Sequence, residues 1–282
     1  MPSRYLKPLF IAATLLATPF ACQAQTTLRL FAASSLTGPL SELGRQFSAQ
    51  TGIQVDIEFG PSGVLQERIE KGEPVDVFAS ANMTYPLRLE KEGKAASAVV
   101  FTRNRLCVLA RPDLELNTTQ LLTRLLAPAT RIGTSTPGDD PGGDYAWMMF
   151  DKAGRVVPGA DAVLKGKAMM LVGGRHSPAI PAGQDPMKYY LLTRHQVDTF
   201  VGYCSTRTPG TDTQINRVEL PPELAIAADY GVSVLTRSAV QGDAGYRFAL
   251  FLLSPASQRV MTRYGYTPVT AEAANGNRAA QP

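Results

Sequence analysis

Residues 28–80 read LRLFAASSLTGPLSELGRQFSAQTGIQVDIEFGPSGVLQERIEKGEPVDVFAS, and this stretch decides the fold class. Short apolar runs alternate there with runs in which apolar residues recur at helical spacing. The strand-like runs are 28–33, 53–59 and 75–79, and the helical runs are 38–51 and 63–71. Gly52 and Gly72 follow the two helical runs, where glycine is a typical helix stop. Alternation of this kind predicts an α/β lobe with mostly parallel strands.

The alternation continues after a third helix expected at 85–92, and a second lobe is predicted to begin near Asn104. The same patterns place strands at 106–110, 131–133, 167–172, 199–203 and 231–236, and helices at 118–126, 144–153, 187–195, 244–253 and 255–264. The stretch 173–183, GGRHSPAIPAG, is rich in glycine and proline and is expected to be an irregular loop.

Composition is that of an ordinary globular protein, and it excludes several classes. The chain has 282 residues, 44% of them hydrophobic and 18% charged, which excludes a disordered chain and a small disulfide scaffold. The length suggests two domains or one large one. The formal net charge is +4, and Arg4 and Lys7 supply two of these charges. No basic run marks a nucleic-acid surface, so no nucleic-acid partner is expected.

The first 24 residues have the pattern of a secretory signal peptide. Arg4 and Lys7 precede the apolar run 9–17, and small residues end the segment at Cys22-Gln23-Ala24. Cleavage is expected after Ala24, which places the mature protein in the periplasm. The apolar run is shorter than the roughly 20 residues of a spanning helix. A lipoprotein with Cys22 as its first residue is an alternative, although Pro19-Phe20-Ala21 fits such a site poorly.

The cysteines and histidines leave one question open. Cleavage after Ala24 leaves Cys107 and Cys204, each in an apolar, strand-like run. They are either paired, as an oxidising compartment permits, or buried as free thiols. His176 and His195 are not spaced with the cysteines as zinc ligands are.

Several strand-to-helix junctions share small, hydroxyl-bearing or Gly/Pro residues without Lys or Arg. They are 32–37, 60–63, 137–143 and 184–187. Ligands of open α/β sheets bind at the carboxyl ends of strands, where helix N-termini present free N–H groups that suit an oxyanion. The alternative is that Ser35, Ser62 and Asp185 only cap helices. Asp139, Asp140 and Asp144 would repel an anion, and they are expected to face solvent or to favour the helix start.

At these junctions the chain resembles a known family. The matching stretches are FAASSLT (31–37), FGPSGVL (59–65), IEKGEPVDVFASA (69–81), TPGDDPGGDYA (136–146), VGY (201–203), LSPASQ (253–258) and RYGY (263–266). They resemble the periplasmic molybdate-binding proteins of ABC transporters. The resemblance covers nearly all of residues 27–267, with a weak zone at 155–195.

The resemblance implies an α/β, two-lobed periplasmic binding protein. Each lobe would be a mixed, mostly parallel sheet flanked by helices, with the ligand cleft between the lobes. Residues 25–103 and 237–282 would form the first lobe and 104–236 the second. Two crossings, near 103–105 and 236–238, would act as a hinge that closes on the ligand. A monomer is expected.

The resemblance also implies the site. The family holds its oxyanion through hydrogen bonds from two serines, two backbone amides and a tyrosine, with no other cofactor. By motif these contacts fall on Ser35, Ser62, Gly142, Met187 and Tyr203. Pro186 has no N–H, so either Met187 or Asp185 would supply the second amide. The implied function is the capture of molybdate or tungstate and its delivery to an ABC permease. A site made only of donors would disfavour phosphate, whose proton would lack an acceptor.

Two other functions remain to be weighed. A relative with a changed ligand, another oxyanion or a small carboxylate, is suggested by Pro186 and the loop 173–183. That loop either reshapes the cleft wall or lies on the surface, and Arg175 in the cleft would favour a carboxylate. A hydrolase would use Ser62 with His176 or His195. The Gly-x-Ser-x-Gly motif is absent around Ser62, so no enzyme is expected.

Overall fold

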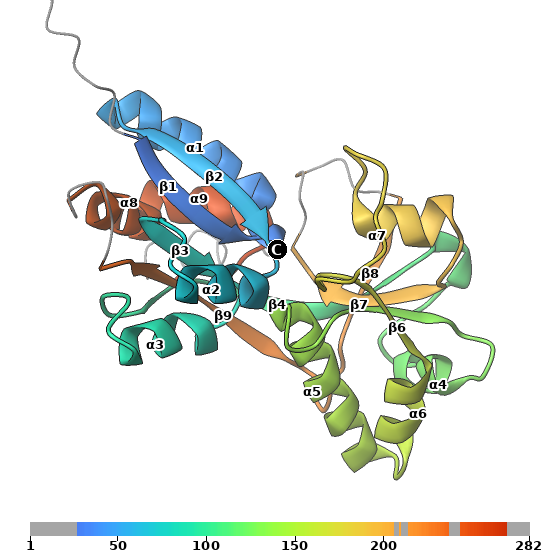
Figure 1. Ribbon diagram of the computed structural model, residues 1–282. Helices are drawn as coiled ribbons and strands as arrows, with labels where there is room; N and C mark the ends of the chain where they lie inside the picture. Colours follow the sequence, from blue (N-terminus) through green and yellow to red (C-terminus); the bar gives the residue numbers. More distant parts are fainter. Residues whose placement is uncertain (1–26, 206–208, 210–213, 237–242, 270–282) are drawn as a thin grey trace, which may run out of the picture.

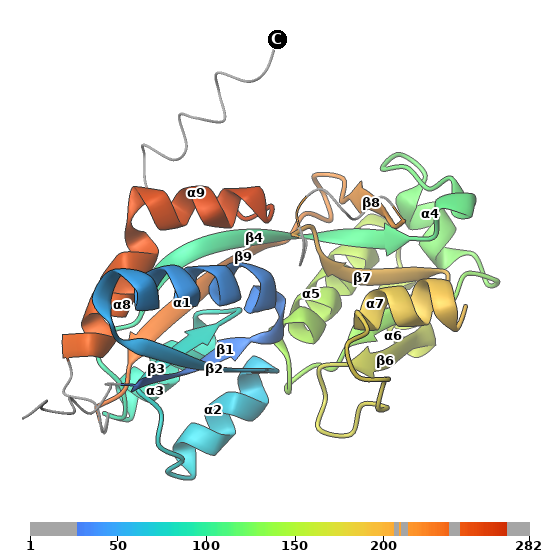
Figure 2. The same cartoon turned by 90° about the horizontal axis from the view of Figure 1, so that it is seen from above.

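The computed structural model describes residues 27–205, 209, 214–236 and 243–269. The predicted signal peptide at 1–24, Ser238 of the second predicted crossing and the tail after residue 269 lie outside the described residues. Figures 1 and 2 show two groups of strands and helices, which two long strands connect. The molecule therefore has two lobes, as predicted.

The first lobe is built on three parallel strands. β1 (Thr27–Ala33) lies between β2 (Gln54–Gly60) and β3 (Val77–Ser80). Its helices are α1 (Thr37–Thr51), α2 (Ser62–Glu70) and α3 (Thr84–Lys91), and a 3-10 turn, η1 (Ser34–Leu36), joins β1 to α1. Gly52 ends α1 with a φ of 74°, which glycine adopts without strain. These predicted elements are confirmed to within two residues.

The second lobe has its own parallel strands. β5 (Ile132–Ser135) lies between β6 (Ala168–Val172) and β7 (Thr199–Tyr203). Its other elements are the strand β8 (Asn216–Glu219), the 3-10 turn η2 (Pro112–Leu114), and the helices α4 (Leu121–Leu126), α5 (Pro141–Val156), α6 (Ala160–Lys167) and α7 (Pro186–Lys188). After α7 the chain continues as a π-helical turn, η3 (Tyr189–Thr193), where a single α-helix over 187–195 was predicted.

Two strands cross between the lobes. β4 (Val99–Ala110) pairs with β9 (Ala227–Val234) up to Arg105, and from Leu106 onward it pairs with β7. β9 in turn pairs with β3, with Val77 opposite Val234. The division into lobes stays a prediction. β9 begins at Ala227, opposite Arg105 of β4, so the two strands run side by side between the lobes.

These crossing strands also change the sheet. The sheet is mixed, as predicted, with the strands β1 to β3 of the first lobe and β5 to β7 of the second parallel and the central strands antiparallel. At the centre, β9 is antiparallel to β3 and β4, and β4 is antiparallel to β7 and β8. The strand predicted at 106–110 is only the second half of β4, because the polar residues of its first half hide the strand pattern. β8 and α6 were not predicted.

The last helices return to the first lobe. α8 (Asp243–Leu253) and α9 (Pro255–Arg263) pack with α1, beside which Figure 1 shows them. Phe47 and Phe248 meet edge to face, with ring centroids 5.1 Å apart. In the second lobe Cys107 and Cys204 form a disulfide, with Cα atoms 5.0 Å apart, which settles the question that the sequence left open. Within the described residues no helix is long and apolar enough to span a membrane.

Candidate functional site

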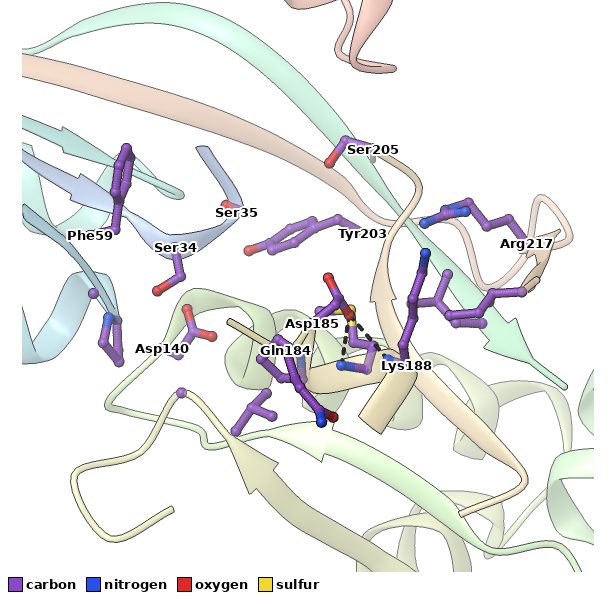
Figure 3. Close-up of a pocket in the computed structure, with 18 of the residues that line it drawn as sticks. Ser34, Ser35, Phe59, Asp140, Gln184, Asp185, Lys188, Tyr203, Ser205 and Arg217 are labelled. Carbon is purple, nitrogen blue, oxygen red and sulfur yellow. Dashed lines mark hydrogen bonds between the residues drawn. The ribbon is translucent and has the colours of Figure 1, made fainter. Parts of the chain in front are cut away.

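A cavity of about 670 Å³ lies between the two lobes (Figure 3). The first lobe supplies the residues that directly follow β1 and the end of β2. The second lobe supplies the loop before α5, the ends of the loop 173–183, the start of α7 and the end of β7. The polar side chains among the lining residues are Ser34, Ser35, Asp140, Gln184, Asp185, Lys188, Tyr203, Ser205 and Arg217.

The position of the cavity follows from the parallel strands. β1 ends at Ala33 and β2 at Gly60, and because the two strands are parallel their carboxyl ends lie at the same edge of the sheet. Ser34, Ser35 and Gly60 therefore come together at one wall. This is the general position of ligand sites in open α/β sheets.

Ser35 is held in place by two distant tyrosines. Its hydroxyl pairs with Tyr230 Oη of β9 at 3.0 Å, and its carbonyl accepts a hydrogen bond from Tyr266 Oη at 2.7 Å. Asn104 of β4 also donates to Tyr230 Oη, at 3.3 Å. Both crossing strands thus support the hydroxyl that was predicted to bind the oxyanion.

Ser62 lies at the start of α2 and is fully buried. Its Oγ accepts a hydrogen bond from the amide of Ala81 at 3.1 Å, which leaves the hydroxyl proton able to donate. Its neighbours Gly60 and Pro61 line the cavity, but Ser62 is not among the lining residues. Its predicted contact with the ligand therefore stays a prediction.

Tyr203 is the last residue of β7 and faces the cavity from the second lobe. It is 8% exposed, and among the described residues its hydroxyl has no hydrogen-bond partner at normal geometry, although the phenol of Tyr230 lies next to it, with ring centroids 5.7 Å apart. In Figure 3 this hydroxyl points toward Ser34 and Ser35 on the opposite wall. Burial raises the pKa of Tyr203 well above its usual range, so the hydroxyl keeps its proton and can donate it.

The two predicted backbone donors already face carboxylates. The amide of Gly142, near the start of α5, points to Oδ1 of Asp140 at 3.5 Å. The amide of Met187 donates to Oδ1 of Asp185 at 2.9 Å, so Asp185 caps α7 as the capping alternative expected. Met187 lines the cavity, whereas Gly142 is not among the lining residues. Both amides would have to exchange these partners to bind an anion.

Asp140 is the functional candidate that sequence reasoning missed. It caps α5 but also lines the cavity, where it was expected to face solvent or only to favour the helix start. Its Oδ2 accepts a hydrogen bond from Ser135 Oγ. Asp140 is partly exposed because one side of its side chain borders the cavity. Protein atoms surround the rest of the carboxyl group. Burial, with a smaller contribution from Asp144 and Asp139, raises its pKa to about 6.

The other two aspartates of this segment do not line the cavity. Asp144 accepts a hydrogen bond from the amide of Gly138 at 2.8 Å, and Asp139 forms an ion pair with Arg175 at 2.7 Å. The one sequence signal that separates Asp140 from them is the proline that follows it. Proline favours the first position of a helix, so the residue before it is the N-cap.

The loop 173–183 has two roles. Gly173 and Gly183, at its ends, line the cavity, whereas Arg175 does not. Arg175 bridges Asp139 and Glu67 of α2, the latter at 3.0 Å, and thus connects the lobes outside the cavity. The arginine that lines the cavity is Arg217 and not Arg175. A side chain at Gly173 would collide with Oδ2 of Asp140, 2.5 Å from the added Cβ.

Further contacts hold the lobes together beside the cavity. The amide of Gly63 donates to the carbonyl of Asp139 at 2.9 Å, and Tyr85 Oη donates to the carbonyl of Gly138 at 2.9 Å. A Cβ at Gly63 would lie only 2.6 Å from the Gly138 oxygen. Glycine is thus required here for the loop before α5 to contact the start of α2.

The histidines take no part in the cavity. His176 and His195 are both outside its lining, so neither is positioned there as a base for Ser62. In the described part of the chain, His, Cys, Asp and Glu side chains form no cluster of three or more that could hold a metal ion.

Sequence comparison identifies the family. The family model for bacterial extracellular solute-binding proteins matches residues 28–267, and thus spans both lobes and the cavity. The chain belongs to this family. An uncharacterized protein of Pasteurella multocida (strain Pm70) is 36% identical to this solute-binding protein over 216 residues, which are 76% of the chain and 89% of that relative.

Two further comparisons concern molybdate-binding proteins. The molybdate-binding protein ModA of Azotobacter vinelandii is 37% identical over 83 residues, 29% of this solute-binding protein and 33% of ModA. The solved structure of the Azotobacter vinelandii periplasmic molybdate-binding protein aligns with this chain at a TM-score of 0.69 and 21% identity. The alignment covers 86% of this chain and 100% of that protein. The resemblance to that family and the two-lobed α/β fold are confirmed, and the family is one of transport proteins and not of enzymes.

Proposed function

We propose that this solute-binding protein captures a tetrahedral oxyanion, molybdate or tungstate, in its interlobe cavity and delivers it to the permease of an ABC transporter. The protein is exported by cleavage after Ala24, acts in the periplasm as a monomer and catalyses no reaction. Ser35, Ser62 and Tyr203 donate side-chain hydrogen bonds to the oxyanion, and Gly142 and Met187 donate backbone ones. These bonds reach the oxygens of the anion, and no protein atom coordinates its metal.

The unpartnered hydroxyl of Tyr203 is the observation that carries this proposal. A buried hydroxyl without a partner costs about 1–3 kcal/mol, so folded proteins retain few of them. Here the hydroxyl faces a cavity whose opposite wall carries Ser34 and Ser35. A ligand with hydrogen-bond acceptors supplies the missing partner. The partial matches to molybdate-binding proteins favour a metal oxyanion as that ligand.

Calorimetric titration of the mature protein with molybdate, tungstate, sulfate and phosphate tests the proposal. Molybdate and tungstate are expected to bind with similar affinities and sulfate more weakly, because the smaller ion leaves the fixed donors too far apart. If neither molybdate nor tungstate gives a heat of binding, the proposal is contradicted. A matching thermal shift, on the order of 10 °C at 1,000 times the dissociation constant, is the independent check.

Two serine variants test the placement of the site. Ser35→Ala and Ser62→Ala are each expected to lose roughly 1.5–3 kcal/mol of binding free energy, the usual contribution of a hydrogen bond to a charged group. Ser62→Ala should also lower the free energy of unfolding, because it leaves the buried amide of Ala81 without its acceptor. Full molybdate affinity in the double variant would show that the anion binds elsewhere.

Asp140 favours a second candidate, a same-fold protein with a changed ligand. Phosphate was disfavoured because a site of donors alone offers its proton no acceptor, but Asp140 places an acceptor on the cavity wall. Another oxyanion that carries a proton is therefore the alternative best supported. A small carboxylate is not favoured by Arg175, which pairs with Asp139 and Glu67 outside the cavity, but Lys188 and Arg217 line the cavity and could pair with one. The titration with phosphate discriminates this candidate from the first.

A further inference from the structure

The cavity wall contains a carboxyl group among hydrogen-bond donors. In Figure 3 the carboxyl of Asp140 points toward Ser34 of the opposite lobe, and the Tyr203 hydroxyl lies in the same space. Ser135 holds one oxygen of this carboxyl, and Gly173 makes room for it. The carboxyl is therefore held on the wall of the same cavity that Tyr203 and Ser35 line, beside the space where an anion bound to them would lie.

The surroundings of Asp140 do not neutralise its charge. Its own segment contributes two more carboxylates, Asp139 and Asp144. The neighbouring ionisable groups from other elements are the phenols of Tyr203 on β7 and Tyr85 on α3, both with raised pKa values and therefore neutral. Asp185, Lys188 and Arg217 are the other charged side chains that line the same cavity, and Arg175, outside the lining, pairs with Asp139 and Glu67. No ion pair of the described residues includes Asp140.

An ionised carboxylate and an oxyanion cannot occupy adjacent positions without a hydrogen between them. Like charges at hydrogen-bond distance raise the cost of ionising the second group, as in paired carboxylates that share one proton. The raised pKa of Asp140, about 6, means that its burial makes protonation easier than for an ordinary aspartate, although the carboxyl is mostly ionised above pH 7. A protonated carboxyl is a donor and fits an anion, whereas an ionised one is an acceptor and needs a proton on the ligand.

We infer that Asp140 is a further ligand-binding and specificity-determining residue, which holds one hydrogen between its carboxyl and the bound oxyanion. This inference rests on the proposed function. The hydrogen has two possible sources. Molybdate and tungstate bring none near neutral pH, so Asp140 takes a proton from solvent when they bind. Hydrogen phosphate brings its own proton and donates it to the ionised carboxylate.

The inference makes molybdate binding dependent on pH. When only the protonated carboxyl accepts the anion, the apparent affinity falls about tenfold per pH unit above the pKa of Asp140. With that pKa at about 6, the affinity for molybdate should fall roughly 20-fold between pH 5.5 and pH 7.5. At the upper pH about one proton should be taken up for each molybdate bound.

Calorimetry of the unmodified mature protein measures this proton directly. Molybdate is titrated at pH 7.5 in two buffers with different enthalpies of ionisation, and the difference in heat gives the number of protons exchanged. About one proton taken up supports the inference. Binding of molybdate with no proton uptake and with a constant affinity from pH 5.5 to 7.5 overturns it and leaves the proposed function intact.

A variant then assigns the proton to Asp140. Asparagine is an equally good helix cap and presents a neutral donor. Asp140→Asn should therefore bind molybdate at least tenfold more tightly than the unmodified protein at pH 7.5, with no pH dependence. The matched control is Asp144→Asn, which removes a carboxylate one helical turn away and outside the cavity lining. This control should keep the pH dependence, with its midpoint moved slightly to lower pH because Asp144 contributes to the raised pKa of Asp140. The same flat profile in both variants would overturn the assignment.

Phosphate separates the two sources of the proton. If phosphate binds at pH 8 without net proton uptake and neither metal oxyanion binds, the hydrogen comes from the ligand and the inference holds for the second candidate function. If none of molybdate, tungstate, sulfate and phosphate binds between pH 5.5 and 8, the proposed function fails and the inference fails with it. Failure of the inference alone is recognised differently, because molybdate then binds without proton uptake and with constant affinity.

Discussion

Tyr203 shows at the scale of one residue how binding can oppose stability. Its hydroxyl is buried without a partner in the described structure, so it destabilises the ligand-free protein. Tyr203→Phe is expected to lose roughly 1.5–3 kcal/mol of oxyanion binding free energy. The same change should leave the free energy of unfolding unaltered or raise it by up to about 1 kcal/mol, because the ring and its contacts are kept. Calorimetric titration and thermal unfolding measure the two effects.

Tyr230→Phe is the control for that variant. Tyr230 is also a buried tyrosine, but its hydroxyl pairs with Ser35 and Asn104. Removal of this hydroxyl should therefore destabilise the protein, by about 1–2 kcal/mol. If both variants lost the same free energy of unfolding, the Tyr203 hydroxyl would have a partner within the protein, and it would no longer indicate a ligand.

At the scale of elements, β4 is both a connection and an anchor. It pairs with β9 in its first half and with β7 in its second, so it is the strand through which one lobe continues into the other. The disulfide joins Cys107 in β4 to Cys204, the residue after Tyr203. It therefore fixes the end of β7, the strand that brings Tyr203 to the cavity.

Loss of this disulfide should destabilise the protein. The two cysteines are 97 residues apart in sequence, and a cross-link over so long a loop restricts the unfolded chain strongly. We expect a loss of about 2–4 kcal/mol when Cys107 and Cys204 are reduced or both replaced by alanine. Thermal unfolding with and without reductant measures it. Reductant should not change the thermal unfolding of the double alanine variant. If it did, the effect of reductant on the unmodified protein would not come from this disulfide alone.

At the scale of the whole molecule, Gly63 allows the lobes to meet. Its amide donates to Asp139 of the other lobe, and an added Cβ would lie 2.6 Å from one backbone oxygen and 2.7 Å from another. Gly63→Ala is therefore expected to hold the lobes apart and to weaken oxyanion binding at least tenfold, with α2 intact because alanine favours a helix. Titration and the radius of gyration from solution scattering in the presence of ligand measure both effects.

The matched control is Gly166→Ala in α6. This glycine is also helical, and an added Cβ there meets nothing within 4 Å. The variant should bind oxyanion normally and close normally. Equal binding by the Gly63 and Gly166 variants would mean that the contact between the start of α2 and the loop before α5 is not needed for the ligand-bound state.

The sequence by itself determined the local features of this protein. Helical spacing with Gly52 at its end fixes α1, and the apolar runs around it fix β1 and β2. Ser35 and Tyr203 are found at the cavity because each lies at or just after the end of a short, buried strand. These features depend on neighbours a few residues away, which periodicity and helix-stop signals report.

Only the tertiary structure decided what depends on distant residues. The antiparallel crossing of β4 and β9, the disulfide and the bridge from Arg175 to Glu67 each join segments far apart in the chain. Asp140 is the sharpest case. Three aspartates lie within six residues, and the sequence gives all three the same charge. The fold pairs Asp139 with Arg175, gives Asp144 a backbone amide and places Asp140 on the cavity wall, because each position before and within the first turn of α5 meets a different partner.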